Sequence, residues 1–198
     1  MEYKVLVEGK HEKQEEKVMI GSTVTLIKTD KNIIVDTGSF LDRDKLIAEL
    51  KKQNLTPEDI DIVILTHLHL DHIVNVDLFK NAKVYCKFRG GEYPGQFHTP
   101  QEGCLQRTKI DDNVEIADNV KFLLTPGHSM DCISVLVETE KGKIVISGDA
   151  IASEEWASKE KQPDKIVIPH VEEYNKSREK ILKIADYIIP GHGKMFKV

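Results

Sequence analysis

Short runs of apolar residues, separated by polar and turn-forming residues, recur along the whole chain. Continuous apolar runs of this length are typical of strands that are buried on both faces. We expect strands at residues 5–7, 22–27, 33–35, 60–65, 83–86, 120–124, 133–138, 144–147 and 187–189. The polar stretch from Glu8 to Lys17 follows the first strand and predicts a loop or the tip of a long hairpin.

Two segments follow the helical period instead. In residues 43–53 the apolar side chains fall on one face after Asp42, which can cap the first turn, and residues 172–185 show the same spacing. The pair Thr56-Pro57 predicts a further helix start, because proline suits the first helical turn. The strands come in two batches, each closed by a helix, which predicts two sheets packed together with helices outside.

Composition narrows the class of protein. The 198 residues are 40% hydrophobic and 31% charged, which favours one globular domain over residues 1–198. The apolar runs are far shorter than the roughly 20 residues that span a bilayer, so we expect no membrane partner. No apolar signal segment follows the start of the chain, which predicts a cytoplasmic location. The net charge of -5 argues against a nucleic-acid partner, because phosphate binding relies on Lys and Arg.

Histidine and aspartate gather directly after four of the predicted strands. These strand ends supply His67, His69, Asp71, His72, His128, Asp149 and His192. A strand that delivers a side chain into a tight turn can hold it accurately, and glycine in three of the turns permits unusual backbone angles. Imidazole nitrogen and carboxylate oxygen both bind zinc, and the same set admits iron or manganese. The clustering predicts a site for a pair of divalent metal ions, with zinc as the expected metal.

The order of these residues, HxHxDH followed by distant His, Asp and His, resembles the signature of the metallo-β-lactamase superfamily. The turn Asp36-Thr37-Gly38 also matches an early turn of that family. The similarity spans residues 33–193. It implies an α/β fold, an αββα four-layer sandwich, with the metal site at one edge between the two sheets.

The resemblance also implies a role for each ligand. His67, His69 and His128 would bind the first metal, Asp71, His72 and His192 the second, and Asp149 would bridge both. Asp71 would also be catalytic. Asp36 would support the site through hydrogen bonds beside the metal turn.

The implied reaction is hydrolysis by a hydroxide that bridges two metals. Two divalent ions carry +4 and two carboxylates with one hydroxide remove three units, so about one positive charge remains to hold an anionic oxygen of the substrate. Metal binding lowers the pKa of water from about 15.7 towards 7. β-Lactamases of this family typically carry Cys or Ser where Asp149 stands, which argues against a β-lactam substrate. The expected substrate is a small ester, lactone or thioester.

Other activities remain open, because fold and metals do not choose a substrate. The alternatives are a phosphodiesterase or ribonuclease and an iron persulfide dioxygenase-like oxidoreductase. The segment 87–107 is the expected lid, and Arg89, Tyr93 and His98 are candidate contacts with a small-molecule substrate. His11 falls outside the ligand pattern and is expected to be solvent-exposed, and the oligomeric state is left open.

Overall fold

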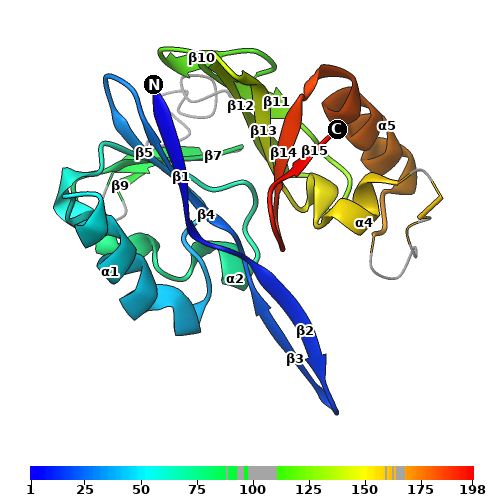
Figure 1. Cartoon of the computed structure of the whole chain (residues 1–198), viewed down its shortest axis with the longest axis horizontal. Coiled ribbons are helices and arrows are strands. Elements are labelled where there is room, and N and C mark those ends of the chain that lie inside the picture. The colour runs from blue at the N-terminus through cyan, green and yellow to red at the C-terminus, as the bar shows by residue number, and fades with distance from the viewer. Residues whose placement is uncertain (88, 93–95, 98–110, 159, 162, 164–167) are drawn as a thin grey trace.

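The computed structural model describes residues 1–87, 89–92, 96–97, 111–158, 160–161, 163 and 168–198, with the backbone alone at 89–92 and 96–97. Two sheets form the body of the molecule (Figure 1). The first has the order β1 (Glu2–Val7), β4 (Val24–Lys28), β5 (Asn32–Val35), β6 (Ile62–Ile64), β7 (Lys83–Cys86), β8 (Arg89–Glu92) and β9 (Gln96–Phe97). The second has the order β10 (Glu115–Ala117), β11 (Val120–Leu124), β12 (Ile133–Thr139), β13 (Gly142–Gly148), β14 (Tyr187–Pro190) and β15 (Phe196–Lys197).

Helices cover the outer faces of the two sheets (Figure 1). The long ones are α1 (Arg43–Lys52) on the first sheet and α5 (Val171–Ile184) on the second. The shorter ones are α2 (Leu70–Ile73), α4 (Glu154–Ala157) and the 3-10 turns η1 (Phe40–Asp42), η2 (Pro57–Asp59), η3 (Val76–Leu78) and η5 (Asp149–Ile151). The predicted αββα sandwich is confirmed.

Successive side chains of the buried strands point alternately into the core between the sheets and into the core beneath a helix. In β5, Ile33 and Val35 lie in the core between the sheets, whereas Ile34 packs in the core that includes Leu46 and Leu50 of α1. Because successive side chains of a strand point to opposite faces, an uninterrupted apolar run serves both cores at once.

Strand β13 repeats this arrangement in the second sheet. Ile144 and Ile146 face the core between the sheets, and Val145 packs with Ile181 of α5 in the outer core. The predicted strand cores all recur within a few residues of their expected bounds. The helix start at Thr56-Pro57 develops only into η2, since Ile60 is already extended and β6 begins at Ile62.

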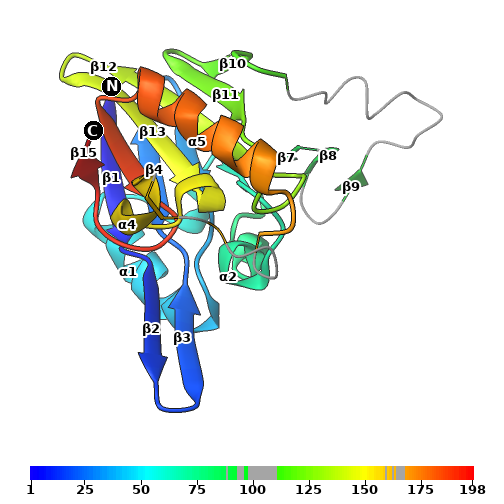
Figure 2. The ribbon, with the colours of Figure 1, turned by 90° about the vertical axis from the view of Figure 1, so that its right-hand side faces the viewer.

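A third, two-stranded sheet projects from the sandwich (Figure 2). It is the hairpin of β2 (Lys10–Gln14) and β3 (Lys17–Gly21), and it includes the stretch for which the sequence predicts a loop or a long hairpin tip. Within the described ranges, no helix is both long and apolar enough to cross a membrane.

Candidate metal centre

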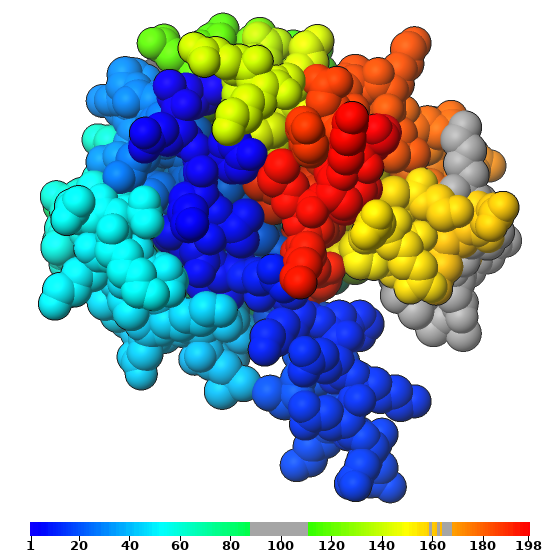
Figure 3. Space-filling model, viewed as in Figure 1, coloured from blue at the N-terminus to red at the C-terminus, as the bar shows by residue number. Residues whose placement is uncertain are grey.

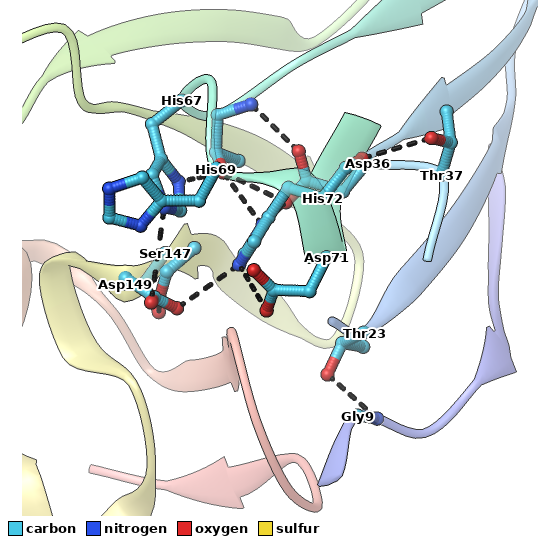
Figure 4. Close-up of polar contacts among 12 residues, drawn as sticks. Gly9, Thr23, Asp36, Thr37, His67, His69, Asp71, His72, Ser147 and Asp149 are labelled. Carbon is cyan, nitrogen blue, oxygen red and sulfur yellow. Dashed lines mark hydrogen bonds and ion pairs between the residues drawn. The ribbon is translucent and has the colours of Figure 1, made fainter. Parts of the chain in front are cut away.

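The candidate ligands meet at one edge of the sandwich because strand pairing aligns the turns that carry them. Strands β13 and β14 are parallel, with Ile146 beside Ile189, so the turns that follow them hold Asp149 and His192 close together. Strands β5 and β6 are also parallel, which brings Asp36 beside the turn that carries His67. The carboxyl ends of parallel strands therefore build the site from both sheets (Figure 4).

The ligand atoms form two groups. His67, His69, His128 and Asp149 make one, and Asp71, His72 and His192 make the other. Within each group the ligand atoms lie within 4.8 Å of one another. In the first group, Nδ1 of His69 lies 3.0 Å from Nε2 of His128. These are the two sets that the family resemblance implies, now brought together in space.

Asp149 lies between the two groups and turns one carboxylate oxygen to each. Its Oδ2 is 3.3 Å from Nε2 of His128 and 3.9 Å from Nε2 of His67. Its Oδ1 is 3.2 Å from Nε2 of His192 and 3.5 Å from Nε2 of His72. A carboxylate in this position can bind two cations simultaneously.

Buried atoms without hydrogen-bond partners concentrate here. Of the nine such side-chain atoms among the described residues, five belong to this site, namely Nε2 of His67, His72 and His192, Oδ2 of Asp71 and Oδ1 of Asp149. A buried polar atom without a partner costs about 1–3 kcal/mol. The five converge, and all are nitrogen or oxygen donors of the kind that divalent transition metals bind, so the residues fit a metal centre.

Hydrogen bonds fix the orientation of the imidazole rings. Nδ1 of His72 lies 2.8 Å from Oδ2 of Asp36, and Nδ1 of His192 lies 3.0 Å from the carbonyl oxygen of Gly21. Both oxygens can only accept, so in the neutral ring each Nδ1 carries the proton, which leaves the Nε2 lone pair directed into the site and available to a metal. Asp36, expected to support the site, is placed where it can do so.

Asp36 also holds the turn that follows β6. Its Oδ1 accepts a hydrogen bond from the backbone N–H of Thr66, and its Oδ2 accepts one from the hydroxyl of Thr66, both at 2.8 Å. The residue is buried and has a φ of 57°, a conformation that Asn and Asp adopt more readily than most residues. Asp36 therefore joins the β5 and β6 turns through a backbone conformation that suits its residue type.

Burial and charge give the two groups different protonation behaviour. Burial, with His72 nearby, lowers the pKa of His67 to about 2, and burial also lowers the pKa of His128. Burial opposes charge on His72 and His192 as well, but Asp36 and Asp149 raise the pKa of His72 well above its usual value, and Asp149 raises the pKa of His192. Despite its own burial, Asp149 has a pKa well below the usual range because of these two rings.

Acidification is expected to empty the Asp71–His72–His192 group first. As pH falls, protons compete with a metal for His72 and His192, whose pKa values are raised, while His67 and His128, whose pKa values are lowered, stay neutral. Zinc content measured after dialysis at stepwise lower pH should pass through a plateau near one ion per chain. Simultaneous loss of both ions would contradict this difference.

Gly191 allows the Asp149 carboxylate to approach the β14 turn. A Cβ at Gly191 would lie 2.0 Å from Oδ1 of Asp149, and its nearest backbone contact would be 3.0 Å away at Gly148. We expect Gly191→Ala to displace the carboxylate and to lower zinc content at both groups. Gly193→Ala is the matched control, because the nearest atom to its Cβ would be 4.0 Å away, although its φ of 125° adds backbone strain. In both variants, zinc content would report displacement of the Asp149 carboxylate, and thermal unfolding would report backbone strain.

The predicted substrate contacts lie largely outside the described residues. This holds for Tyr93 and His98 and for the side chain of Arg89, whose backbone lies in β8. His11 is exposed, as expected, and it also lies near a candidate ligand, because its ring centroid is 6.1 Å from that of His192.

Sequence reasoning also passed over Asp131, whose Oδ2 accepts a hydrogen bond of 3.1 Å from the backbone N–H of Leu68 in the ligand turn. Its position three residues after His128 is the only signal that the sequence offers.

Sequence comparison identifies relatives over most of the chain. The family model described as the Metallo-beta-lactamase superfamily matches residues 19–192. Metallo-beta-lactamase domain-containing protein 1 of Xenopus laevis is 35% identical over 184 residues, which is 89% of this chain and 72% of that protein. The chain covers 63% of the rat protein of the same name. An N-acyl homoserine lactonase of Bacillus cereus is 30% identical over 112 residues, covering 53% of this chain and 44% of the lactonase.

Solved structures share the fold. A putative metallo-beta-lactamase from Thermotoga maritima superposes with a TM-score of 0.72 at 23% identity, over 100% of this chain and 99% of that one. A dizinc quorum-quenching lactonase in complex with the product N-hexanoyl-L-homoserine has a TM-score of 0.56 at 20% identity, covering 84% of this chain and 69% of that one. The expectation of a metal-dependent hydrolase is confirmed at this level, because the similar proteins include metallo-hydrolases and lactonases.

Proposed function

Since the chain belongs to the metallo-β-lactamase superfamily, we propose that it is a dinuclear metal-dependent hydrolase that cleaves lactones or small esters. The observation that carries the proposal is the position of Asp149, whose two carboxylate oxygens face separate groups of ligand atoms. Seven ligands around two ions would leave coordination positions for water and substrate, whereas structural zinc sites are usually closed by four.

The ligand assignment follows the two groups of atoms. His67, His69 and His128 would hold one ion and Asp71, His72 and His192 the other, with Asp149 between them. When bound, two divalent ions supply an activated water at neutral pH and positive charge that polarises a carbonyl oxygen. Zinc is our preferred metal because of the histidine-rich set, and iron or manganese would also fit.

The protein's own groups would orient the metal ligands and transfer a proton. Asp36 and the Gly21 carbonyl keep the lone pairs of His72 and His192 directed into the site. The Asp71 side chain is 14% exposed, against 7% for Asp149, so it is the more accessible of the two carboxylates. We assign Asp71 the acceptance of a proton from the attacking water and its transfer to the departing alkoxide, which leaves a carboxylate and an alcohol as products.

A carboxylic substrate is favoured over a phosphodiester by the relatives. One similar sequence is named an N-acyl homoserine lactonase, and one similar structure contains the product of lactone opening. Ring opening of such a lactone requires attack on one carbonyl carbon and release of one alkoxide. A positively charged pair of ions would stabilise the carbonyl oxygen as it gains negative charge, and one proton would neutralise the alkoxide.

The test combines metal analysis with a substrate panel. Zinc-loaded protein should contain two ions per chain and should cleave N-acyl homoserine lactones and p-nitrophenyl esters. Bis(p-nitrophenyl) phosphate and RNA are expected to remain intact under the same conditions. Cleavage of only the phosphodiesters would replace the proposal with the phosphodiesterase alternative. A single bound iron with oxygen consumption on a persulfide would replace it with the oxidoreductase.

A further inference from the structure

The first group of ligands (His67, His69 and His128) draws its side chains from both sheets. His67 and His69 lie in the turn after β6, and His128 lies in the turn after β11. Figure 3 shows the two halves of the chain meeting along a seam, with blue and cyan residues on one side and yellow to red residues on the other. Because zinc–nitrogen bonds are only about 2.0–2.1 Å long, one ion can bind all three imidazoles only if the two turns keep a fixed separation.

The Asp131 carboxylate connects these two turns. Its Oδ2 accepts a hydrogen bond of 3.1 Å from the backbone N–H of Leu68, and its Oδ1 accepts one of 2.5 Å from the hydroxyl of Ser129. Leu68 directly precedes His69, and Ser129 directly follows His128. One carboxylate therefore joins the chain neighbours of two ligands whose Nδ1 and Nε2 atoms lie 3.0 Å apart.

The beginning of the turn after β6 has its own connection to the second sheet. The backbone N–H of Ile133, the first residue of β12, donates to the carbonyl oxygen of Thr66 at 2.8 Å. Thr66 is also held by the Asp36 carboxylate. Since Thr66 directly precedes His67, these bonds fix the backbone on the His67 side of the turn, and they would persist without Asp131.

The His69 side of the turn receives less support from packing. His67 is fully buried, whereas His69 is exposed and the Leu68 residue is 49% exposed. Packing therefore holds the His67 ring, while the position of His69 depends more on hydrogen bonds of the backbone beside it. The bond from the Leu68 N–H to Asp131 has an ionised acceptor, and such bonds are roughly twice as strong as neutral ones.

We propose that Asp131 is a positioning residue that holds His69 within reach of the ion bound by the first group. The proposal rests on the two-metal site of the proposed function and gives Asp131 no contact with substrate. The second group (Asp71, His72 and His192) is oriented by other atoms, namely the Asp36 carboxylate and the Gly21 carbonyl oxygen. Asp131 therefore acts on one of the two groups.

Zinc affinity tests the proposal without turnover. Competition with a chromophoric chelator would be compared for the wild type and Asp131→Ala. The variant loses both acceptor oxygens, so the affinity for one ion should fall by about 10–100-fold while the other ion is retained. Nitrogen chemical shifts of the imidazole rings, which change when a metal binds, should show that His69 and His128 have lost their ion and that His192 has kept its own. Unchanged affinity for both ions would overturn the proposal.

Asp131→Asn is the conservative variant. The carbonyl oxygen of the asparagine can accept from the Leu68 N–H, and its amide can donate to the hydroxyl oxygen of Ser129. Both connections are kept, so zinc affinity should stay close to that of the wild type. If Asp131→Asn loses as much affinity as Asp131→Ala, the carboxylate does not act through these two hydrogen bonds and the positioning role is wrong.

Asp186→Ala is the matched control. Asp186 is exposed, and its Oδ2 also accepts a hydrogen bond from a backbone N–H in another strand, that of Lys143 at 2.7 Å. It lies before the start of β14, whereas the ligand turn follows the end of that strand. Both zinc affinities should be unchanged in Asp186→Ala. An equal loss of zinc in the two alanine variants would reduce the effect to a general loss of stability and overturn the proposal.

Hydrogen exchange of the metal-free protein examines the key bond directly. The Leu68 amide should exchange about fivefold faster in Asp131→Ala than in the wild type or in Asp186→Ala. Equal exchange rates in all three proteins would overturn the proposal. Selective loss of zinc in Asp131→Ala, in a protein that cleaves no ester or lactone, would overturn the proposed reaction and keep the role of Asp131. Hydrolysis by a wild type and an Asp131→Ala variant with equal zinc affinities would do the reverse.

Discussion

Replacing Asp149 with alanine is expected to abolish hydrolysis and to lower metal occupancy at both groups. Its two carboxylate oxygens face both sets of ligand atoms, at 3.2–3.9 Å from four imidazole nitrogens. Loss of a residue that merely supports a metal ligand costs 10–100-fold in affinity or activity. Removal of a shared ligand should therefore lower kcat/KM by at least about 100-fold, measured together with zinc content.

Asp77→Asn provides the control for the Asp149 variant. Asp77 is also a charged aspartate, but it pairs with Arg43 at 2.9 Å on the surface and is 55% exposed. Surface pairs of this kind contribute only about 0–1 kcal/mol, so metal content and turnover should be unaffected. If Asp149→Ala retains two zinc ions and normal turnover, Asp149 does not bridge the groups.

The second large effect is expected from Asp36→Asn. The Asp36 carboxylate accepts hydrogen bonds from the Thr66 N–H, the Thr66 hydroxyl and Nδ1 of His72. Asparagine has nearly the same shape and tolerates the φ of 57°, but it offers only one accepting oxygen. The amide NH2 of the asparagine would then face a hydrogen-bond donor. A shift of the His72 proton from Nδ1 to Nε2 would remove this clash, but it would also block the nitrogen that binds metal.

Zinc content and kcat/KM measure the result for Asp36→Asn. Affinity at the Asp71–His72–His192 group should fall by about 10–100-fold, while the His67–His69–His128 group retains its ion. The change also reduces the charge that raises the pKa of His72. Asp59→Asn is the control, because Asp59 accepts hydrogen bonds from the N–H and hydroxyl of Thr56 in the exposed η2 turn. Equal loss from both metal groups would refute the proposed tautomer mechanism.

The sandwich could be predicted in outline because its strands are continuous apolar runs. Strands β7 and β11 occupy the expected residues 83–86 and 120–124, and β13 extends the expected 144–147 by two residues at its start and one at its end. Burial on both faces produces this pattern, so the strands could be located without knowledge of their partners. Their order in each sheet was not predicted from the sequence.

The hairpin shows where local pattern is insufficient. Every residue of β2 is exposed, so neither face carries an apolar stripe that would distinguish a strand from a loop. The strand is defined by its pairing with β3 and by the bonds at its base. The relationship between His11 and His192 likewise depends on contacts between segments at opposite ends of the chain.

The sequence by itself predicted the seven candidate ligands, because each follows a recognisable strand in a short turn, and its resemblance to the metallo-β-lactamase superfamily implied the fold and the two sets of ligands. Only the tertiary structure decided which oxygen of Asp149 faces which set, which nitrogens of His72 and His192 keep a free lone pair, and where His11 lies. These features depend on atoms from different strands, and only strand pairing and the packing of two sheets bring those atoms within hydrogen-bonding distance or ring contact.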